Sequence, residues 1–407
     1  MRTTLWLLSF CLIGACTTSS KTENTSMETP EKGTFGYDLD FLQKRDHDVA
    51  VLSSDDSTSQ VIVSAKYQGK VFTSTADGMS GRSFGWVHYK AFDGQPDAHM
   101  NAYGGENRLW LGPEGAQYSL FFKPGAKMEF EQWHTPPAFD TEPWHVTSKT
   151  AQSVVMDKDM ILTNYAGTTL QLKIDRSVTL LSREEAASRL NTSLANNVKL
   201  VGYQTDNSIT NSGSTAWTPK TGAPCLWMLD MFVPSPGVTI VIPYEEQATG
   251  NVATTDYFGQ IPPDRVTYKN GVLYFKADGK SRGKLGIPPK RAKPIAGSYD
   301  ADNNVLTLTL FDVDKNATYL NQEWKLVPDP LKGDVVNAYN DGPLADGSQM
   351  GPFYEIESVS PAAFLKPAEK LTHKHAVFHF TGEKSQLDAI AQKTLGVSLD
   401  TIQKALK

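Results

Sequence analysis

The 407-residue chain has few cysteines, no concentration of basic residues and, after its first residues, no long apolar run. Its 39 Lys and Arg are outnumbered by 45 Asp and Glu, for a net charge of −6. This balance excludes the basic footprint of a nucleic-acid-binding protein. No later segment approaches the roughly 18 consecutive apolar residues of a membrane-spanning helix. Because phosphate-binding loops, dinucleotide fingerprints and serine nucleophile elbows are also missing, we expect no cofactor.

The first residues have the pattern of a bacterial lipoprotein signal. An apolar run at 5–13 is too short to span a bilayer, and it is followed by two small residues and Cys16. We expect residues 1–15 to be a signal peptide, Cys16 to carry the lipid (palmitate) and residues 16–37 to be a flexible tether. Thr17, in place of an Asp, favours the outer membrane, with the protein on the periplasmic or the surface side. The alternative is an uncleaved anchor or a buried strand.

The small number of cysteines also limits which interactions can stabilise the fold. Of the three cysteines, Cys11 leaves with the signal peptide and Cys16 is lipidated, so only Cys225 remains and no intramolecular disulfide can form. Stability must therefore come from the core. Cys225 stands between apolar residues, which favours a buried small hydrophobe over a reactive nucleophile.

What the chain does contain is a series of short strand-like segments. They are rich in β-branched and aromatic residues, several alternate apolar with polar, and turn signals at 269–271 and 300–304 separate some of them. The clearest are 61–65, 70–74, 170–174, 238–242, 272–275, 305–310 and 376–380. We predict an all-β fold, a large antiparallel double-layer sandwich; a propeller is less favoured because no blade-length repeat is visible.

Two helical regions stand out against this pattern. Ser182 and Glu185 form a capping box, which predicts a helix over 183–190. The residues from 384 to 407 carry apolar side chains at helical spacing, interrupted near Gly396, and predict one or two short helices packed on the body. No linker-like composition interrupts residues 38–383, so we expect one β-domain there.

The segment 101–115 combines residue types that suit a sugar. Arg108 can donate to vicinal oxygens, Glu106 and Glu114 can accept hydroxyl protons, and Trp110 offers a stacking face. The paired glycines at 104 and 105 would let the backbone approach a ligand. The alternative is a tight turn whose charges pair with each other.

Two further groups of residues extend this reading. Asn211, Trp227 and Asp230 belong to a stretch of amides, tryptophans and an acid that could form one wall of a site, although Trp227 could equally be core. Glu355 and Glu357 are two residues apart, so on a strand both project to one face, where their repulsion would raise one pKa. A solvent-facing acidic edge is the alternative for this pair.

The C-terminal motifs resemble the last strands of the galactose mutarotase-like supersandwich. In that family a strand with a functional Glu is followed by Ser-Pro, a Leu-x-Pro-Gly-Glu-type turn and a final strand. This chain has the same order of features at 354–357, Ser360-Pro361, 365–369 and 375–380, with Ala368 in place of the Gly. The segments 104–115 and 209–217 also resemble a group of bacterial lipoproteins assigned to that fold. The resemblance spans about residues 38–383 and implies a supersandwich, to which the helical patterns described above add a few short helices and a helical tail.

The resemblance also implies roles for single residues. A mutarotase uses a His to protonate the ring oxygen and a Glu to take the anomeric proton, and the Glu corresponds to Glu355 or Glu357. No His occupies the expected segment 209–217, and none occurs between His145 and His373; Arg108 or His88 could fill that place. We expect no metal, because three converging ligands are not found.

Three hypotheses follow for the function. The first is a lipid-anchored envelope protein that binds a carbohydrate, serving glycan uptake or processing, with Arg108, Trp110, Trp227 and their neighbours in the cleft. The second, from another class, is a sugar mutarotase or epimerase with Glu355 or Glu357 as the base. The third is a structural component of an envelope complex with a vestigial site. The sequence leaves the sugar and the oligomeric state open.

Overall fold

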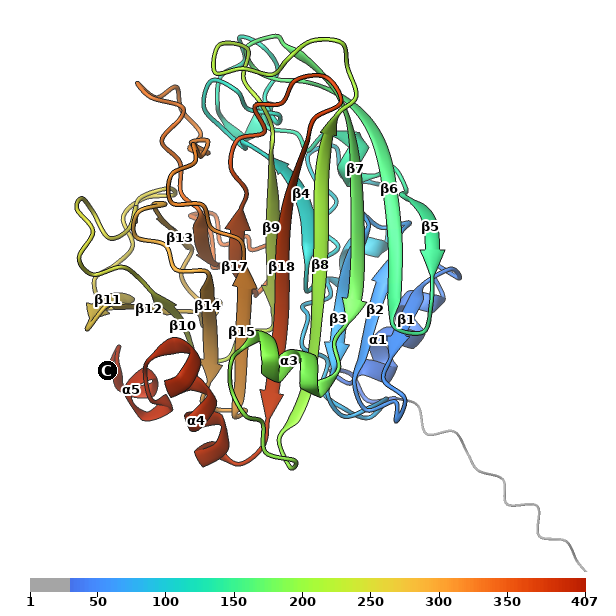
Figure 1. Ribbon diagram of the computed structural model, residues 1–407, viewed down its shortest axis with the longest axis vertical. Helices are drawn as coiled ribbons and strands as arrows, with labels where there is room; N and C mark the ends of the chain where they lie inside the picture. Colours follow the sequence, from blue (N-terminus) through green and yellow to red (C-terminus); the bar gives the residue numbers. More distant parts are fainter. Residues whose placement is uncertain (1–29) are drawn as a thin grey trace, which may run out of the picture.

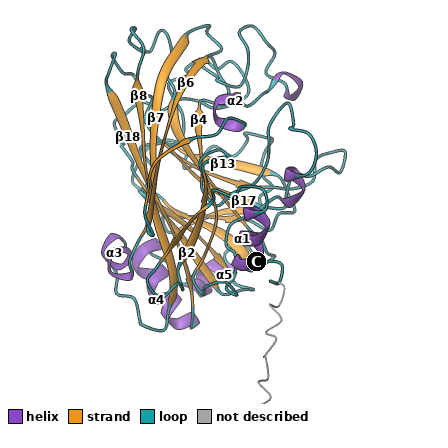
Figure 2. Ribbon diagram, turned by 90° about the vertical axis from the view of Figure 1, so that its right-hand side faces the viewer, coloured by secondary structure: helices purple, strands orange, loops and turns teal. Residues whose placement is uncertain are grey.

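The computed structural model describes residues 30–407, and its body consists of two layers of antiparallel strands packed face to face (Figures 1 and 2). The expected signal peptide, the lipidation site Cys16 and most of the expected tether lie outside the described residues. Among residues 30–407, none of the helices combines the length and the hydrophobicity that crossing a bilayer requires.

The first layer is a ten-stranded sheet with the order β11-β12-β10-β14-β15-β18-β8-β7-β6-β5. Its strands are β5 (His145–Lys149), β6 (Ser153–Thr163), β7 (Thr169–Leu180), β8 (Lys199–Asn211), β10 (Val238–Pro243), β11 (Val266–Lys269), β12 (Val272–Lys276), β14 (Ile295–Asp300), β15 (Val305–Phe311) and β18 (Lys370–Thr381). Side chains of β6 and β7 alternate between buried and exposed, as expected where one face of a sheet covers the core and the other meets solvent.

The second layer is a five-stranded sheet with the order β13-β16-β17-β9-β4, flanked by a three-stranded sheet. The strands are β4 (Arg108–Gly112), β9 (Cys225–Phe232), β13 (Gly283–Ile287), β16 (Val336–Asn340) and β17 (Tyr354–Val359), and β1 (Ala50–Ser53), β2 (Gln60–Ser64) and β3 (Lys70–Thr75). A bridge between Val71 and Asn107 joins the two sheets. In Figure 2, β4, β13 and β17 lie opposite β6, β7, β8 and β18.

Short helices cover the ends of the sandwich and part of the solvent side of the ten-stranded sheet. They are α1 (Phe35–Gln43), α2 (Pro137–Asp140), α3 (Arg183–Arg189), α4 (Lys384–Leu395) and α5 (Leu399–Lys404), with the 3-10 turns η1 (Tyr89–Phe92) and η2 (Phe130–Gln132). Helices α4 and α5 bury Leu387, Ile390 and Leu399 against the ten-stranded sheet, at its lower end in Figure 1. This apolar face holds the C-terminal residues on the body.

The structure confirms the all-β class, and each strand predicted above forms. The capping box of Ser182 and Glu185 begins α3, and Gly396, with a left-handed φ of 73°, separates α4 from α5. Cys225 is buried, as expected. The tether was predicted to run to residue 37, but α1 already begins at Phe35; Thr34 caps this helix and Phe35 is buried in an apolar cluster. The sequence analysis missed α1.

Strands β9 and β17 are buried over their whole length. One face of each packs on the ten-stranded sheet, so their full burial means that loops cover the other face as well. That second, loop-covered face of the five-stranded sheet is called the outer face below.

Candidate functional site

The outer face is defined by the strand register. Tyr354 and Ser358 of β17 point inward, because their hydroxyls contact Ser298 of β14 and the histidines of β18. Alternation then places Glu355 and Glu357 on the outer face, as the sequence predicted. Residues directly opposite in antiparallel strands share a face.

Cross-strand partners bring distant parts of the sequence to the two glutamates. Glu357 lies opposite Leu229 of β9, and Leu229 lies opposite Arg108 of β4. On the other side, Glu355 lies opposite Tyr339 of β16, and Tyr339 opposite Lys284 of β13. Four strands thus contribute to one charged group, here called the outer-face cluster; its members are Arg108, Glu114, Trp227, Lys284, Glu355 and Glu357.

Each member of the outer-face cluster is at most 8% exposed, and two ion pairs join four of its charged groups. Trp227 Nε1 and Lys284 Nζ donate to the same oxygen of Glu357, Oε2, at 2.8 and 3.0 Å. Arg108 Nη2 lies 3.6 Å from Glu355 Oε1, close enough for an ion pair but too long for a hydrogen bond. Two tryptophan rings complete the surroundings: Arg108 lies 3.8 Å from the Trp110 ring and Lys284 4.7 Å from the Trp227 ring.

The two glutamates differ in their electrostatic environment. Burial, followed by the negative charge of Glu357, raises the pKa of Glu355 to about 8, and Arg108 only partly opposes this rise. For Lys284, burial would lower the pKa, but the charges of Glu357 and Glu114 outweigh it and the pKa is raised. Glu355 is therefore a carboxylic acid at neutral pH, whereas Lys284 stays charged beside Glu357.

Many polar atoms of this face have no hydrogen-bond partner among residues 30–407. The donors are Arg108 Nε and Nη1 and the indole nitrogens of Trp110 and Trp133; the acceptors are Glu355 Oε1, Glu357 Oε1 and Asn337 Oδ1. Buried polar groups are normally paired, and leaving one unpaired costs about 1–3 kcal/mol. Donors and acceptors thus stand side by side on one face with their bonding capacity unused.

Loops around residues 254–258 and 322–327 cover the outer-face cluster. The Tyr257 ring lies 5.9 Å from Lys284 Nζ, and the Tyr257 hydroxyl donates to Asp334 at 2.7 Å. Trp324 packs edge-on against Phe258 at 6.2 Å. The loop around 322–327 also contacts Glu114, whose backbone N–H donates to Gln322 Oε1.

Six residues predicted from the sequence meet here: Arg108, Trp110, Glu114, Trp227, Glu355 and Glu357. The sequence analysis missed Lys284, Asn337, Tyr339 and Trp324. Their segments, 283–287, 336–340 and 322–327, have no motif of their own, and only the register of β13 and β16 brings Lys284 and Asn337 beside β17. No signal along the chain could have found them.

Four other predicted residues lie away from the outer-face cluster. Glu106 and Asp230 point to the inner face, where Glu106 pairs with His379 at 3.1 Å and Asp230 with His375 at 2.6 Å. Asn211 ends β8 and donates to the backbone carbonyls of Thr215 and Leu365, so it supports a turn. His88 lines a separate groove.

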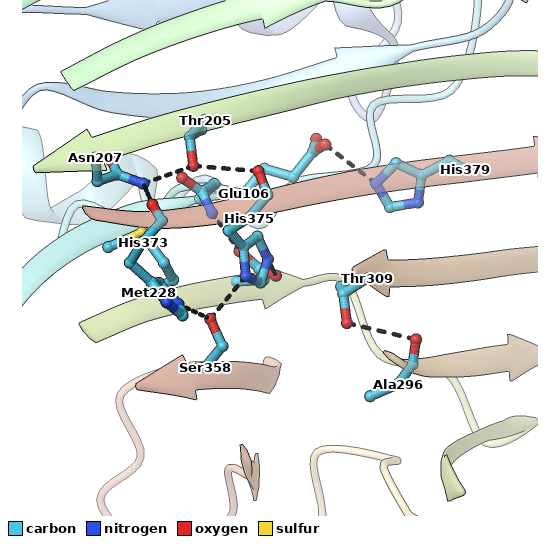
Figure 3. Close-up of polar contacts among 12 residues, drawn as sticks. Glu106, Thr205, Asn207, Met228, Ala296, Thr309, Ser358, His373, His375 and His379 are labelled. Atoms are coloured by element: carbon cyan, nitrogen blue, oxygen red, sulfur yellow. Dashed lines mark hydrogen bonds and ion pairs between the residues drawn. The ribbon is translucent and has the colours of Figure 1, made fainter. Parts of the chain in front are cut away.

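The inner face holds a second buried polar network, part of which is drawn in Figure 3. Ser358 Oγ lies 2.8 Å from both His373 Nε2 and His375 Nδ1, and His375 continues to Asp230. This is a Ser-His-Asp series, but all three residues are fully buried between the sheets, where no substrate can reach them. We therefore assign it to the core, where it links β17, β18 and β9.

Gly104 and Gly105 serve packing, which differs from the prediction. Both have positive φ, and a Cβ on Gly104 would lie 2.2 Å from the backbone oxygen of Trp86. The glycines thus admit a neighbouring chain segment rather than a ligand. Within the part of the chain that the structure describes, no three His, Cys, Asp or Glu side chains are grouped as for a metal ion.

The fold and the site together define a class: an all-β sandwich with a buried acid–base cluster on the outer face of its smaller sheet. More particularly, the chain belongs to the family described as "Family of unknown function (DUF6786)", whose profile matches residues 33–406. Among curated proteins, none matches it.

Several solved structures have a similar chain trace. A galactose mutarotase-like protein of Lactobacillus casei is 11% identical with a TM-score of 0.47, over 81% of this chain and 99% of that one. The Slr1438 protein of Synechocystis is 15% identical with a TM-score of 0.47, over 82% and 96%. A galactose mutarotase related enzyme of Lactobacillus acidophilus is 8% identical with a TM-score of 0.43, over 81% and 97%.

Proposed function

We propose that the protein binds a carbohydrate at the outer-face cluster. The observation that carries the proposal is the set of buried, unpartnered donors and acceptors around Arg108, Trp110, Glu355 and Glu357. A polyol presents hydroxyl groups that donate and accept at once, so a single sugar ring can satisfy both kinds of atom. Tryptophan rings beside the charges supply the apolar contact that the C–H face of a sugar needs.

The charge distribution favours a neutral ring over a simple ion at this place. Lys284 is paired with Glu357, and Arg108 lies in the field of Asp140, Glu357 and Glu114, so neither cation offers its full charge to an anion. Since the loops around 254–258 and 322–327 cover the site, a ligand enters only when these segments move.

The test is calorimetric titration of the full chain with a panel of free hexoses and methyl glycosides. Trp110→Phe removes one unpartnered indole N–H and keeps a six-membered aromatic ring in its place, and we expect it to weaken binding about tenfold. Trp144→Phe is the matched control. The indole nitrogen of Trp144 is equally buried and unpartnered, but the Trp144 ring packs against Gly69, away from the outer-face cluster. Absence of binding throughout the panel, or equal effects of the two variants, refutes the proposal and favours a structural protein with a vestigial site.

A second candidate function is a mutarotase or epimerase activity at the same place. It is favoured by one observation: Glu355 is held neutral and can give a proton, while Glu357, which is paired with Lys284, can accept one. We would measure anomer exchange by NMR on each sugar that binds. Exchange faster than the spontaneous rate, abolished by Glu355→Gln and by Glu357→Gln, supports the enzyme; binding without exchange leaves the binding protein.

We further propose a lipid anchor at Cys16 and a place in the cell envelope, on the outer membrane. The support is the apolar run at 5–13 followed by small residues and cysteine, with Thr17 after it. Cys16→Ala should abolish incorporation of labelled palmitate and release the protein from the membrane fraction. Labelling of the Cys16→Ala protein would refute this anchor.

A further inference from the structure

A groove separate from the outer-face cluster lies beside the ends of β9 and β17. Its volume is about 560 Å³, within the range of small-molecule sites. Its lining comes from four parts of the chain: residues 32–38, residues 83–90 and the loops at 233–234 and 349–352.

The groove has an aromatic wall and an apolar rim. Trp86 stacks between His88, at 5.0 Å, and Phe353, at 4.6 Å, so the wall is rigid. On the rim, Val233 and Met350 are 44% and 38% exposed, so two apolar side chains stand beside the groove. A ligand with an apolar face would cover them.

The charges around the groove are positive. Lys32 and Lys90 line it, and neither forms an ion pair with any residue in 30–407, although Lys32 Nζ lies 4.9 Å from the Tyr89 ring and its charge acts on Asp38. Asp38 is the one acidic side chain among the described lining residues, and it is buried and already engaged by the hydroxyls of Ser83 and Tyr89. Burial also raises the pKa of Asp38. The open charges therefore belong to the lysines, in a protein whose net charge is −6.

The groove continues the outer face that holds the cluster. Trp86 donates its backbone N–H to Met231, and Met231 lies opposite Glu355 in the pairing of β9 with β17. Two strand spacings of about 4.8 Å each thus separate the Trp86 segment from Glu355, a span of roughly two adjacent sugar rings. Trp86, Met231, Tyr339 and Phe353, each at most 9% exposed, form one apolar cluster between the two places, so one ligand reaches both only when these side chains or the segments over them move.

We propose that this groove binds the anionic part of an acidic oligosaccharide whose neighbouring ring occupies the outer-face cluster. Lys32 and Lys90 would oppose a carboxylate, sulfate or phosphate substituent, and His88, whose Nδ1 is engaged by the carbonyl of Ala102 at 2.9 Å, would present its Nε2 to a hydroxyl. This inference rests on the proposed function and adds the class of ligand: an anionic glycan of at least two rings.

The test compares three probes by calorimetry on the full chain: a β-linked glucose disaccharide, the same disaccharide with one ring oxidised to a uronic acid, and the same disaccharide bearing a sulfate. Inorganic phosphate alone is a fourth titrant. We expect an anionic disaccharide to bind about tenfold more tightly than the neutral one in 20 mM salt, and this advantage to shrink in 500 mM salt. The better of the two acidic probes identifies the substituent.

The variants separate the groove from the cluster. Lys32→Gln with Lys90→Gln should remove the advantage of the acidic disaccharide and leave the neutral one unchanged, whereas Lys269→Gln, an exposed lysine on β11, should change neither. Trp110→Phe should weaken both disaccharides. Because both groove lysines are exposed, the melting temperature of the double variant should equal that of the wild type, which confirms its fold.

Two outcomes overturn the inference while the proposed function stands. One is equal affinity for neutral and acidic disaccharides in the wild type. The other is lysine-dependent binding of inorganic phosphate as tight as that of the acidic disaccharide, which would make the groove an isolated anion site. Failure of every disaccharide to bind, by contrast, refutes the proposed function itself.

Discussion

The environment of Glu355 makes a quantitative prediction about stability and pH. Its pKa rises from 4.5 to about 8 on folding, because the carboxylate is buried and stands beside Glu357. A carboxyl whose pKa is raised in the folded state does not change the stability below its unfolded pKa. Above that pH the carboxyl ionises in the unfolded state but not in the folded state, so the free energy of unfolding falls until the pH reaches the folded pKa. We therefore expect Glu355 to lower the free energy of unfolding progressively between pH 4.5 and about 8.

The size of the effect follows from that interval. At about 1.36 kcal/mol per pH unit, the difference amounts to at most about 5 kcal/mol above pH 8. Glu355→Gln keeps the shape of the neutral acid and cannot ionise. The variant should thus match the wild type at pH 5 and exceed its stability by a few kcal/mol at pH 9. Urea unfolding followed by tryptophan fluorescence at pH 5, 7 and 9 measures the difference directly, since all other titrating groups are common to both proteins.

Glu357→Gln is the matched comparison on the same strand. It removes the charge that opposes Lys284, leaving a buried ammonium group without its counter-ion. We expect a loss of about 3–5 kcal/mol already at pH 5. Parallel stability curves for the wild type and Glu355→Gln from pH 5 to 9 would refute the assignment of Glu355 as the neutral acid of the site.

Three further predictions concern the framework around the site. Arg176 is fully buried between the sheets and donates to Asn107, Asn207 and the carbonyl of Gly69. Arg176→Met leaves these buried acceptors unpaired, at about 1–3 kcal/mol for each, so it should lower the free energy of unfolding in urea by a few kcal/mol. A loss below about 1 kcal/mol would show that the network is dispensable. Ile390→Ala opens a cavity under α4 and should lower the free energy of unfolding by about 2–5 kcal/mol. Lys393→Ala, at an exposed position of the same helix, should change it by less than about 0.5 kcal/mol. Equal effects of the two variants would contradict the docking of α4. Ser182→Ala removes the cap of α3 and should lower the free energy of unfolding by about 1 kcal/mol, and an unchanged value would mean that α3 needs no cap.

Local patterns in the sequence were sufficient for the fold class. Period-two alternation over a segment such as 170–174 requires only that one face of a strand be buried, and it appears in the burial of β7; the alternating segment 305–310 also forms a strand, β15, but nearly every residue of it is buried. The capping box at Ser182 and the spacing of Leu387 and Ile390 act within a single helix. Helix α1 was missed because its burial depends on partners from β2 and β3, which the local pattern does not contain.

The site divides in the same way. Glu355 and Glu357 were assigned to one face of a strand from their spacing alone, because alternation along a strand is a local property. Which face of a strand meets the core is not local: Asp230 and Glu106 looked equally suited to a ligand, yet register turns them toward His375 and His379.

By itself the sequence determined the class of fold, the helices of the tail, and the residue types from which a sugar site could be built. The tertiary structure alone decided which of them meet. Pairing of β4, β9, β17, β16 and β13 places Arg108, Glu357 and Lys284 together across more than 240 residues of chain, and loops remove them from water. The physical reason is that charge, protonation and unpaired hydrogen bonds depend on neighbours in space and on burial, neither of which is written in the order of the residues.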